Sequence, residues 1–243
     1  KPIMKYPGFD APVRREVISR FLYQQYICEP DSIFEGINKV EPGQVVSFCG
    51  GKKEAYRYWD IKKVYQERKG RFSGSYEEAK EHLLALLQGA VSDRLVADVP
   101  VGSFLSGGFD SSLVTAIAQQ VSPAPVKTFS IGFCEETYNE AGYAREVAKY
   151  LGCDHRELVV SEQDLLGMVE SLPVTYDEPF ADSSQIPSML VAKLAREQVT
   201  VALSGDGGDE LFCGYQTYEK VRQAQLLDGI GEAAGVIGNL FHI

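Results

Sequence analysis

The stretch Leu105–Ser112 reads L-S-G-G-F-D-S-S, and it decides the fold of this chain of 243 residues. An apolar run that begins at Val99 leads into it, and a helical pattern over residues 111–120 leads out of it. The pattern predicts a strand, a glycine turn and the N-terminus of a helix. Gly107 and Gly108 leave no side chains at the turn, so the main chain can wrap closely around a ligand.

The predicted turn is rich in groups that bind anions. Free N–H groups at a helix N-terminus attract negative charge, and the hydroxyls of Ser106, Ser111 and Ser112 add further donors. Asp110 lies among these donors, where its carboxylate repels a phosphate unless a divalent cation bridges the two. These residue types predict a pyrophosphate site with a metal ion. An ordinary strand–turn–helix connection with capping serines is the alternative that the same octet allows.

The octet differs from a Walker loop, because it lacks the G-x-x-x-x-G-K pattern and any lysine near the turn. S-G-G-F-D-S instead resembles the PP-loop of ATP pyrophosphatases. Those enzymes cleave ATP between its α- and β-phosphates and transfer AMP to a substrate. The resemblance therefore implies that ATP is the ligand of this turn.

A second glycine-rich motif, S-G-D-G-G-D-E, occupies Ser204–Glu210, directly after an apolar run at residues 199–203. Three glycines and three carboxylates in one turn are unfavourable as structure alone, because glycine loses entropy on folding and like charges repel. A Mg²⁺ ion would relieve that repulsion and bridge phosphate oxygens. The motif predicts a metal–phosphate site, and a solvated acidic turn that caps the next helix is the alternative.

Strand and helix patterns alternate along most of the chain. Strands are predicted at residues 99–105, 126–133, 157–160 and 199–203. Helices are predicted from residue 75 and at residues 111–120, 140–151, 163–171 and 185–198. This order predicts an α/β fold, with a parallel twisted sheet and helices on both of its faces. Ligands of such sheets bind beyond the carboxyl ends of the strands, so the loops after Leu105, Phe133 and Leu203 are expected to converge.

Two regions are expected, an N-terminal region at residues 1–73 and a domain at residues 74–243. The first is predicted to hold a helix at residues 13–26, a hairpin of residues 44–49 and 54–59, and a polar linker at residues 62–73. Ser75 and Glu78 have the spacing of a capping box at the start of the second.

Composition excludes several classes of protein. The formal net charge of −10 argues against general nucleic-acid binding, and no apolar run has the length of a membrane span. The cysteines are scattered, without a C-x-x-C pair, which suits reduced thiols in a cytoplasmic protein. They are Cys28, Cys49, Cys134, Cys153 and Cys213.

Two further segments allow both a functional and a structural interpretation. Asp182, Ser183 and Ser184 end the stretch Y-D-E-P-F-A-D-S-S, where they either cap the next helix or belong to a loop that closes the nucleotide or substrate pocket. Ser130 and Ile131 lie near the end of the second strand, where they either line an adenine pocket through backbone atoms or belong to the core.

Together these stretches resemble the synthetase domain of glutamine-hydrolysing asparagine synthetases, and the resemblance covers nearly the whole chain. The matching stretches are F-L-S-G-G-F-D-S-S (104–112), F-S-I-G-F (129–133), Y-N-E (138–140), A-R-E-V-A (144–148), L-G-C-D-H (151–155), D-E-P-F-A-D-S-S (177–184) and L-S-G-D-G-G-D-E-L-F-C-G-Y (203–215). The upstream stretches I-x-K-V-E-P-G (37–43) and Y-W-D (58–60) also fit. The serine–glycine loop is shared with other synthetases, whereas its combination with S-G-D-G-G-D-E is more specific.

The resemblance implies the adenine nucleotide α-hydrolase-like fold of the PP-loop ATP pyrophosphatases. It also implies a ligase that adenylates the side-chain carboxylate of aspartate and then forms asparagine with ammonia, using ATP and Mg²⁺. The phosphate-binding residues would be Ser106, Gly107, Gly108, Ser111 and Ser112, and the nucleotide contacts would include Phe104, Leu105, Ser130, Ile131, Ser204 and Gly205. The metal carboxylates would be Asp110 and Asp209, and Asp206 would take part in forming the intermediate.

The chain departs from the resemblance at both ends. It lacks the N-terminal cysteine nucleophile of a glutaminase domain, and the family continues with further helices that supply a phosphate-contacting lysine. We therefore interpret the chain as a fragment that is inactive or incomplete alone, with ammonia delivered from glutamine by the absent domain. Exposed surface at the truncated C-terminal end favours self-association, so a homo-oligomer is one expected state. A related amidotransferase or a β-lactam-synthetase-like enzyme with another carboxylate acceptor, and a fragment that only binds nucleotide, are the alternatives.

Overall fold

The computed structural model of the protein describes residues 1–135 and 139–224. Two compact units are present. The first comprises Lys1–Leu86 and Val160–Ala192, and the second comprises Leu87–Val159 and Lys193–Ile243. Each unit is described by itself below. A domain boundary at residue 73 stays a prediction.

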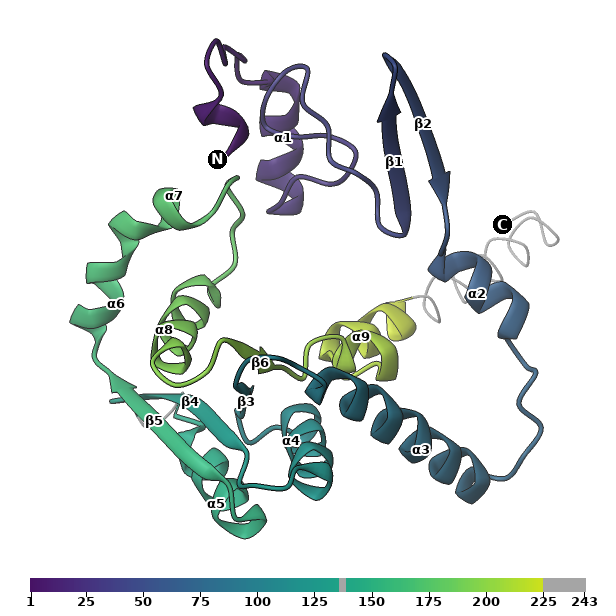
Figure 1. Cartoon of the computed structure of the whole chain (residues 1–243), viewed down its shortest axis with the longest axis vertical. Coiled ribbons are helices and arrows are strands. Elements are labelled where there is room, and N and C mark those ends of the chain that lie inside the picture. The colour runs from purple at the N-terminus through teal and green to yellow at the C-terminus, as the bar shows by residue number, and fades with distance from the viewer. Residues whose placement is uncertain (136–138, 225–243) are drawn as a thin grey trace, which may run out of the picture. The chain divides into compact units, whose positions relative to one another are not determined.

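The second unit is built on a four-stranded sheet with the strand order β5-β4-β3-β6 (Figure 1). Its strands are β3 (Val101–Phe104), β4 (Lys127–Phe133), β5 (Asp154–Val160) and β6 (Val201–Leu203). The central strand β3 pairs in parallel with both β4 and β6, so that Ser103 lies opposite Thr128 on one side and Leu203 on the other. The predicted parallel sheet of an α/β fold is therefore confirmed.

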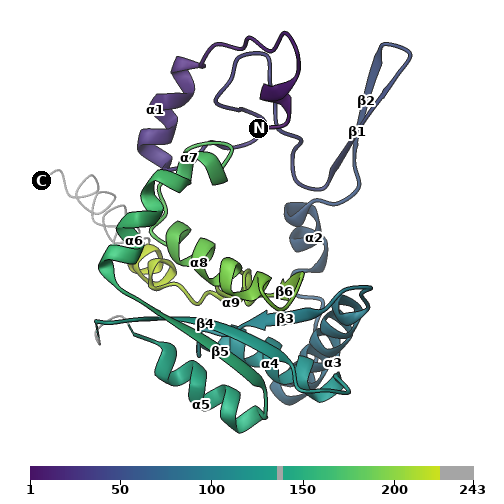
Figure 2. The same ribbon diagram turned by 60° about the vertical axis from the view of Figure 1, so that its left-hand side comes forward.

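Helices cover both faces of this sheet. The helices α4 (Phe109–Val121) and α5 (Ala141–Leu151) lie on one face (Figures 1 and 2). Ser103 faces α4, because its hydroxyl lies 2.9 Å from the hydroxyl of Thr115. The neighbouring Gly102 faces the other side, where a Cβ atom would lie 2.8 Å from the ring of Phe129 and 3.3 Å from Val199, which follows α8 (Gln185–Arg196).

The hydrophobic core lies between the sheet and its helices. One cluster joins the end of α3 (Tyr76–Leu95) to α4, and a second joins the end of β3 to α5. The buried members are Val91, Ile117, Ala118 and Val126 in the first cluster, and Leu105, Ala144 and Ala148 in the second. The face that α5 buries consists of alanines, and such small side chains allow a helix to approach a sheet closely.

Helix α5 ends as the sequence predicts. Gly152 has a φ of 73°, in the left-handed region, and its N–H bonds to the carbonyl groups of Ala148 and Lys149. Glycine is the residue that most readily adopts this conformation at the end of a helix. The strand β5 then begins at Asp154, three residues earlier than the predicted residue 157. Its first four residues, Asp154 to Glu157, are polar or charged, which hides the start of the strand from a search for an apolar run.

The first unit contains the predicted hairpin and its neighbours. Strands β1 (Gln44–Cys49) and β2 (Lys52–Arg57) pair in antiparallel fashion around Gly50 and Gly51, which both have positive φ angles. The helices of the unit include α1 (Arg15–Gln24), α6 (Glu162–Met168) and α7 (Leu172–Thr175), with short 3-10 turns η1 (Ile3–Lys5) and η3 (Val169–Ser171). The predicted helix at residues 163–171 is thus divided between α6 and η3.

The predicted polar linker at residues 62–73 contains a helix in its first half, which was not predicted from the sequence. Residues Ile61–Arg68 form the helix α2, because the Asp60 side chain accepts hydrogen bonds from the N–H groups of Lys62 (2.9 Å) and Lys63 (3.2 Å). An aspartate in this position satisfies the free donors of the first turn.

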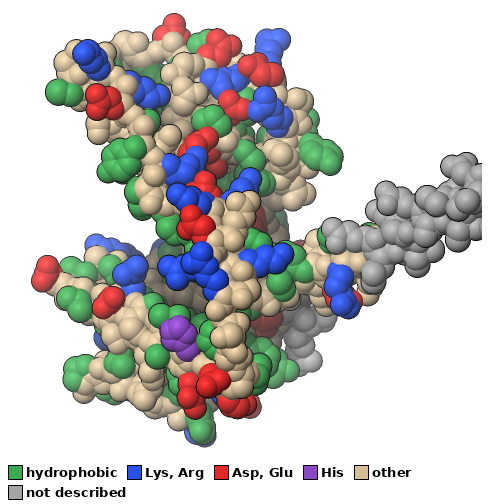
Figure 3. Space-filling model, turned by 90° about the vertical axis from the view of Figure 1, so that its right-hand side faces the viewer, with side chains coloured by type: hydrophobic (Ala, Val, Ile, Leu, Met, Phe, Trp, Pro, Cys, Tyr) green, Lys and Arg blue, Asp and Glu red, His purple; other side chains and the backbone are tan. Residues whose placement is uncertain are grey.

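The surface carries charges of both signs. On the face shown in Figure 3, Lys and Arg side chains lie among Asp, Glu and hydrophobic side chains. None of the helices in the described ranges combines the length and the apolar character that crossing a membrane requires.

Candidate functional site

The candidate site begins where β3 ends, in the loop that the sequence predicts to bind phosphate. The buried residue Leu105 follows the strand, and its N–H bonds to the carbonyl of Phe129 in β4 at 2.9 Å. Helix α4 then begins at Phe109, with Gly108 as its N-cap. The loop is therefore held between the two central strands and the first turn of a helix, as predicted.

Serine hydroxyls hold this loop in shape. The Oγ atoms of Ser106 and Ser111 lie 2.9 Å apart, and the N–H of Ser106 donates to Ser111 Oγ at 3.2 Å. The N–H of Gly108 donates to Ser106 Oγ at 3.2 Å. Ser106 and Ser111 thus brace each other across the turn. As a result, the donors of the loop are fixed before any ligand arrives.

The first turn of α4 is left open to a ligand. The N-cap residue Gly108 has no side chain with which to cap this turn. The hydroxyl oxygen of Ser112 is buried, and it has no hydrogen-bond partner among the described residues. A buried polar atom without a partner is costly, so this turn fits a polar ligand such as a phosphate group.

Gly107 is required by the close approach of α5. Its φ of 85° lies in the left-handed region, and a Cβ atom there would lie 2.6 Å from Cβ of Tyr143 and 2.7 Å from the backbone nitrogen of Ala144. Both conditions exclude a side chain. The first glycine of the motif therefore lets the loop pass directly over the start of α5.

The second glycine-rich loop packs directly against the first, which confirms the expected convergence of the loops after Leu105 and Leu203. A Cβ atom on Gly205 would lie 2.7 Å from the backbone nitrogen of Ser111, and one on Gly208 would overlap the carboxylate of Asp110. The glycines of S-G-D-G-G-D-E thus remove the side chains that would separate the two loops. The geometry places an acidic turn against the residues predicted to bind pyrophosphate.

The second loop also carries the carboxylates of Asp206 and Asp209, and that of Asp209 is turned toward Gly214. Asp209 follows Gly208 in the first turn of α9 (Gly208–Phe212), and Asp206 accepts a hydrogen bond from the hydroxyl of Ser204 at 3.0 Å. Among residues 1–135 and 139–224, no group of three or more His, Cys, Asp or Glu side chains is placed to hold a metal ion by itself. Mg²⁺ beside a nucleotide needs only one or two carboxylates, because phosphate oxygens and waters complete its shell. Asp110 and Asp209 fit that requirement by chemistry.

One polar contact near this loop was not foreseen from the sequence. The hydroxyl of Tyr215 donates to a carboxylate oxygen of Glu210 at 2.8 Å, which ties the turn after α9 back to the helix. This hydrogen bond raises the pKa of Tyr215 to about 12 and holds the pKa of Glu210 below its usual range. In the sequence, the residues Gly214 and Tyr215 shortly after the motif are the feature from which this contact could have been predicted.

At the end of β4, the side chain of Ser130 is not available to contact a nucleotide. Ser130 is buried, and its hydroxyl lies 3.2 Å from Nε2 of His155 in β5. Contact of a nucleotide with the backbone atoms of Ser130 and Ile131 therefore stays a prediction. Tyr138 of the stretch Y-N-E lies outside the described residues.

Asp182, Ser183 and Ser184 lie in the first unit, whereas both glycine loops lie in the second. The carboxylate of Asp182 accepts from the N–H of Ser184 at 2.7 Å, just before α8. Hydrogen bonding from the Ser184 hydroxyl and then from its N–H lowers the pKa of Asp182. The structure thus contains a local turn of the kind that precedes a helix. A role of these residues toward a nucleotide or substrate stays a prediction.

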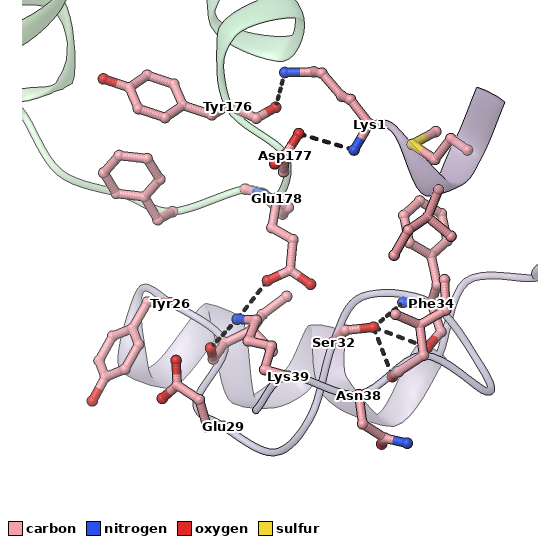
Figure 4. Close-up of a pocket in the computed structure, with 16 residues that line it drawn as sticks. Lys1, Tyr26, Glu29, Ser32, Phe34, Asn38, Lys39, Tyr176, Asp177 and Glu178 are labelled. Atoms are coloured by element: carbon pink, nitrogen blue, oxygen red, sulfur yellow. Dashed lines mark hydrogen bonds and ion pairs between the residues drawn. The ribbon is translucent and has the colours of Figure 1, made fainter. Parts of the chain in front are cut away.

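The first unit also holds a pocket of about 550 Å³ beside the D-E-P turn (Figure 4). The carboxylate of Glu178 faces Lys39 there, pairs with its ammonium group at 2.5 Å, and accepts from the N–H of Ile33 at 2.8 Å. Lys39 also donates to the carbonyl of Ile27 at 2.6 Å. These bonds anchor the turn that precedes Asp182 to the segment around residues 27–39.

A strand followed closely by S-G-G-F-D-S, a helix that starts within that motif, and a glycine-rich acidic loop packed against it define a PP-loop α/β domain. The sequence model of the Asparagine synthase family matches residues 82–234. The chain belongs to the asparagine synthase family.

Three relatives illustrate the similarity. The glutamine-hydrolyzing asparagine synthetase 2 of Methanocaldococcus jannaschii, a protein assigned by name only, is 38% identical over 212 residues. The match covers 85% of this chain and 39% of that protein. The glutamine-hydrolyzing asparagine synthetase 1 of Bacillus subtilis is 32% identical over 87% of this chain and 32% of its own length. The amidase chyE of Penicillium rubens is 29% identical over 80% of this chain and 31% of its own length. The chain thus spans well under half the length of these relatives.

Proposed function

We propose that this chain is the ATP-dependent, amide-forming part of a larger synthetase. A side-chain carboxylate oxygen of aspartate attacks the α-phosphorus of ATP, the bond to the β-phosphate breaks, and pyrophosphate leaves. The product of this step is β-aspartyl-AMP. Ammonia then attacks the acyl carbon, the acyl–phosphate bond breaks, and asparagine and AMP are formed.

The single observation that carries this proposal is the contact between the two glycine loops at Gly205, Gly208 and Asp110. It brings anion-binding donors and acidic side chains to one edge of a parallel sheet, where ligands of α/β proteins bind. Phosphoryl and nucleotidyl transfer need little from a protein beyond positioning and charge stabilisation. This contact supplies groups suited to both tasks.

The proposed roles follow from the chemistry of each group. The N–H groups at the start of α4 and the hydroxyl of Ser112 bind the pyrophosphate portion of ATP. Asp110 and Asp209 hold Mg²⁺, which supplies positive charge against the leaving pyrophosphate. Backbone atoms at Leu105, Ile131 and Gly205 contact the nucleotide, and Asp206 takes part in forming the acyl adenylate. Ammonia comes from glutamine through a glutaminase domain, and the reaction takes place in the cytoplasm.

Asp110→Ala tests the nucleotide site. We expect the unchanged chain to bind ATP only when Mg²⁺ is present, and Asp110→Ala to weaken that binding at least roughly tenfold, because a charge partner of the metal is lost. Isothermal titration calorimetry with and without Mg²⁺ measures both effects. Asp93→Ala, which removes an exposed carboxylate from α3, is the matched control and should bind as the unchanged chain does. Equal binding by the Asp110 and Asp93 variants would refute the assigned site.

The acceptor is tested by following oxygen atoms. Aspartate labelled with ¹⁸O in its side-chain carboxylate should transfer one label to the phosphate of AMP, because that oxygen bridges carbon and phosphorus in the acyl adenylate. The measurement is mass spectrometry of AMP after incubation of the full-length protein with ATP, Mg²⁺ and ammonia. Label that stays in aspartate while AMP accumulates would rule out this acceptor.

A second candidate keeps the adenylation and changes the carboxylate acceptor, and its motive is that one relative carries the name of a different activity, an amidase. In that case aspartate would not support exchange of labelled pyrophosphate into ATP, and a different carboxylic acid would. A panel of carboxylic acids in this exchange assay separates the two candidates. The first candidate requires aspartate to give the fastest exchange.

A further inference from the structure

The ring of His155 bridges two hydroxyl groups of the neighbouring strand. Its Nδ1 atom lies 2.9 Å from Oγ1 of Thr128, and its Nε2 atom lies 3.2 Å from Oγ of Ser130. Thr128 and Ser130 are two residues apart, so they project from the same face of β4. This is the face on which α5 lies, because a Cβ atom on Gly132, two residues further, would meet Ala141 of α5 at 3.0 Å.

Among the residues that the structure describes, the His155 ring is the hydrogen-bond partner of both hydroxyls. Thr128 is completely buried and Ser130 is 4% exposed, so water does not readily replace the histidine. Burial lowers the pKa of His155, nearby Arg145 acts in the same direction, and Glu157 opposes them. A neutral imidazole has one donor and one acceptor nitrogen, and each hydroxyl can take the complementary role. The three side chains therefore satisfy one another.

The two charged groups that act on the pKa of His155 are paired with each other. Glu157, two residues further along β5, receives bonds from the guanidinium group of Arg145 in α5 at 2.8–3.1 Å. A Cβ atom on Gly132 would lie 3.4 Å from a carboxylate oxygen of Glu157. This pair fixes the last residues of β4 from the same side as His155. The imidazole is left to hold Thr128 and Ser130.

The held part of β4 is also the part that touches the loop. The carbonyl of Phe129, between the two hydroxyl residues, accepts from the N–H of Leu105. Ser130 and Ile131 follow. The proposed function places a backbone contact to the nucleotide at Ile131, and one interpretation of the sequence assigns adenine to the backbone of these two residues. Removal of the ring would leave two buried hydroxyls without partners, and such groups drive local rearrangement.

We propose that His155 is a positioning residue for the nucleotide base: it holds β4 through Thr128 and Ser130 and so fixes the backbone that receives adenine. This inference rests on the proposed function. It goes further by separating two parts of the site, the glycine loops that bind the phosphates and a histidine-held strand that orders the base. His155 itself does not touch the nucleotide.

Calorimetry with two probes, Mg²⁺-ATP and Mg²⁺-pyrophosphate, tests the inference on the full chain. His155→Leu should weaken Mg²⁺-ATP binding by roughly tenfold, since two buried hydrogen bonds are lost, and leave Mg²⁺-pyrophosphate binding within about twofold. Asp110→Ala should weaken binding of both probes. A purely structural role for His155 would change both probes equally or neither, and either result would overturn the inference. Failure of the unchanged chain to bind either probe would instead refute the proposed function, and the inference with it.

Two further variants keep the test decisive. Thr115→Val removes the hydrogen bond to buried Ser103 on the same face of the sheet, so it should lower the melting temperature while both probes bind as before. If His155→Leu does not fold, His155→Gln keeps a polar group that can serve one of the two hydroxyls. It should weaken Mg²⁺-ATP binding by a smaller factor, again without loss of pyrophosphate. Unchanged Mg²⁺-ATP binding by a folded His155→Gln would contradict the inference.

Discussion

Two separate structural conditions require glycine at position 107. It needs a positive φ to make the turn after β3, and it needs the absence of a Cβ atom because the backbone of α5 passes over it. A sequence motif reveals the first demand, since glycine turns follow strands in many nucleotide-binding loops. The second demand depends on packing between two segments more than thirty residues apart.

Gly107→Ala should therefore be much more harmful than an ordinary glycine substitution. We expect it to destabilise the protein by about 1–3 kcal/mol, because the methyl group meets backbone atoms that cannot rotate away. We also expect Mg²⁺-ATP binding to be lost. Thermal unfolding and calorimetry measure the two effects.

Gly142→Ala is the control for this change. Gly142 lies on the exposed side of α5, and a Cβ atom there has open space. Alanine in a helix is favoured over glycine by about 0.5–1 kcal/mol, so this variant should melt at a higher temperature. A Gly107→Ala variant with the melting temperature of the unchanged chain would contradict the prediction, because α5 would then have moved to accommodate the methyl group at little cost.

The residue scale also shows where prediction from the sequence ends. The strand, turn and helix start at residues 105–112 could be predicted, because glycines, hydroxyls and the helical pattern lie within a few consecutive residues, whereas phosphate binding there stays a prediction. The role of His155 could not, because its partners Thr128 and Ser130 lie on another strand, 25 to 27 residues away. Nothing in the local pattern around His155 indicates that two buried hydroxyls share its ring.

At the scale of elements, a capping box in the sequence correctly predicts where the helix α3 begins. The box of Ser75 and Glu78 at the start of α3 forms as predicted, with the N–H of Ser75 donating to the Glu78 carboxylate at 2.7 Å and the N–H of Glu78 to Ser75 Oγ at 3.3 Å. The helix α2 was missed because its cap, Asp60, precedes a stretch of mostly exposed side chains without an apolar stripe. Capping residues therefore deserve weight even where hydrophobic periodicity is weak.

The cap of α3 gives a prediction about pH. Hydrogen bonds from Ser75 lower the pKa of Glu78 below its ordinary value of 4.5. The ionised form is thus favoured in the folded state, so its contribution to stability is present above pH 4.5 and is lost as pH falls through the lower folded-state pKa. Glu78→Gln should remove this dependence, and the gap in melting temperature between it and the unchanged chain should close on acidification.

Ser75→Ala separates the charge from the cap itself. It should cost about 1 kcal/mol, the usual value for loss of a capping hydroxyl, at neutral pH. Melting curves of both variants between pH 7 and pH 3 provide the comparison. A gap between Glu78→Gln and the unchanged chain that widens on acidification would contradict the assigned direction of the pKa shift.

At the scale of the whole molecule, the grouping of the chain into units is the feature least visible in the sequence. Residues 160–192 cluster with the N-terminal segment. The bonds that join them connect distant positions, such as Glu178 with the N–H of Ile33 and Ala181 with the carbonyl of Gln25. The alternation of strands and helices predicts one continuous α/β order and contains no signal for such a return.

The effect of Mg²⁺-ATP on amide hydrogen exchange should differ between the two units. Mg²⁺-ATP should slow amide exchange by tenfold or more in the two loops of the second unit, residues 105–112 and 204–209, because bound phosphates occupy their N–H groups. The hairpin of β1 and β2 belongs to the first unit and makes no part of the proposed site, so its exchange should not change. Asp110→Ala should abolish the protection of both loops together, since they bind one metal–nucleotide complex. Protection of one loop without the other would mean that the contact between Gly208 and Asp110 does not create a shared site, and the proposed chemistry would then lose its physical basis.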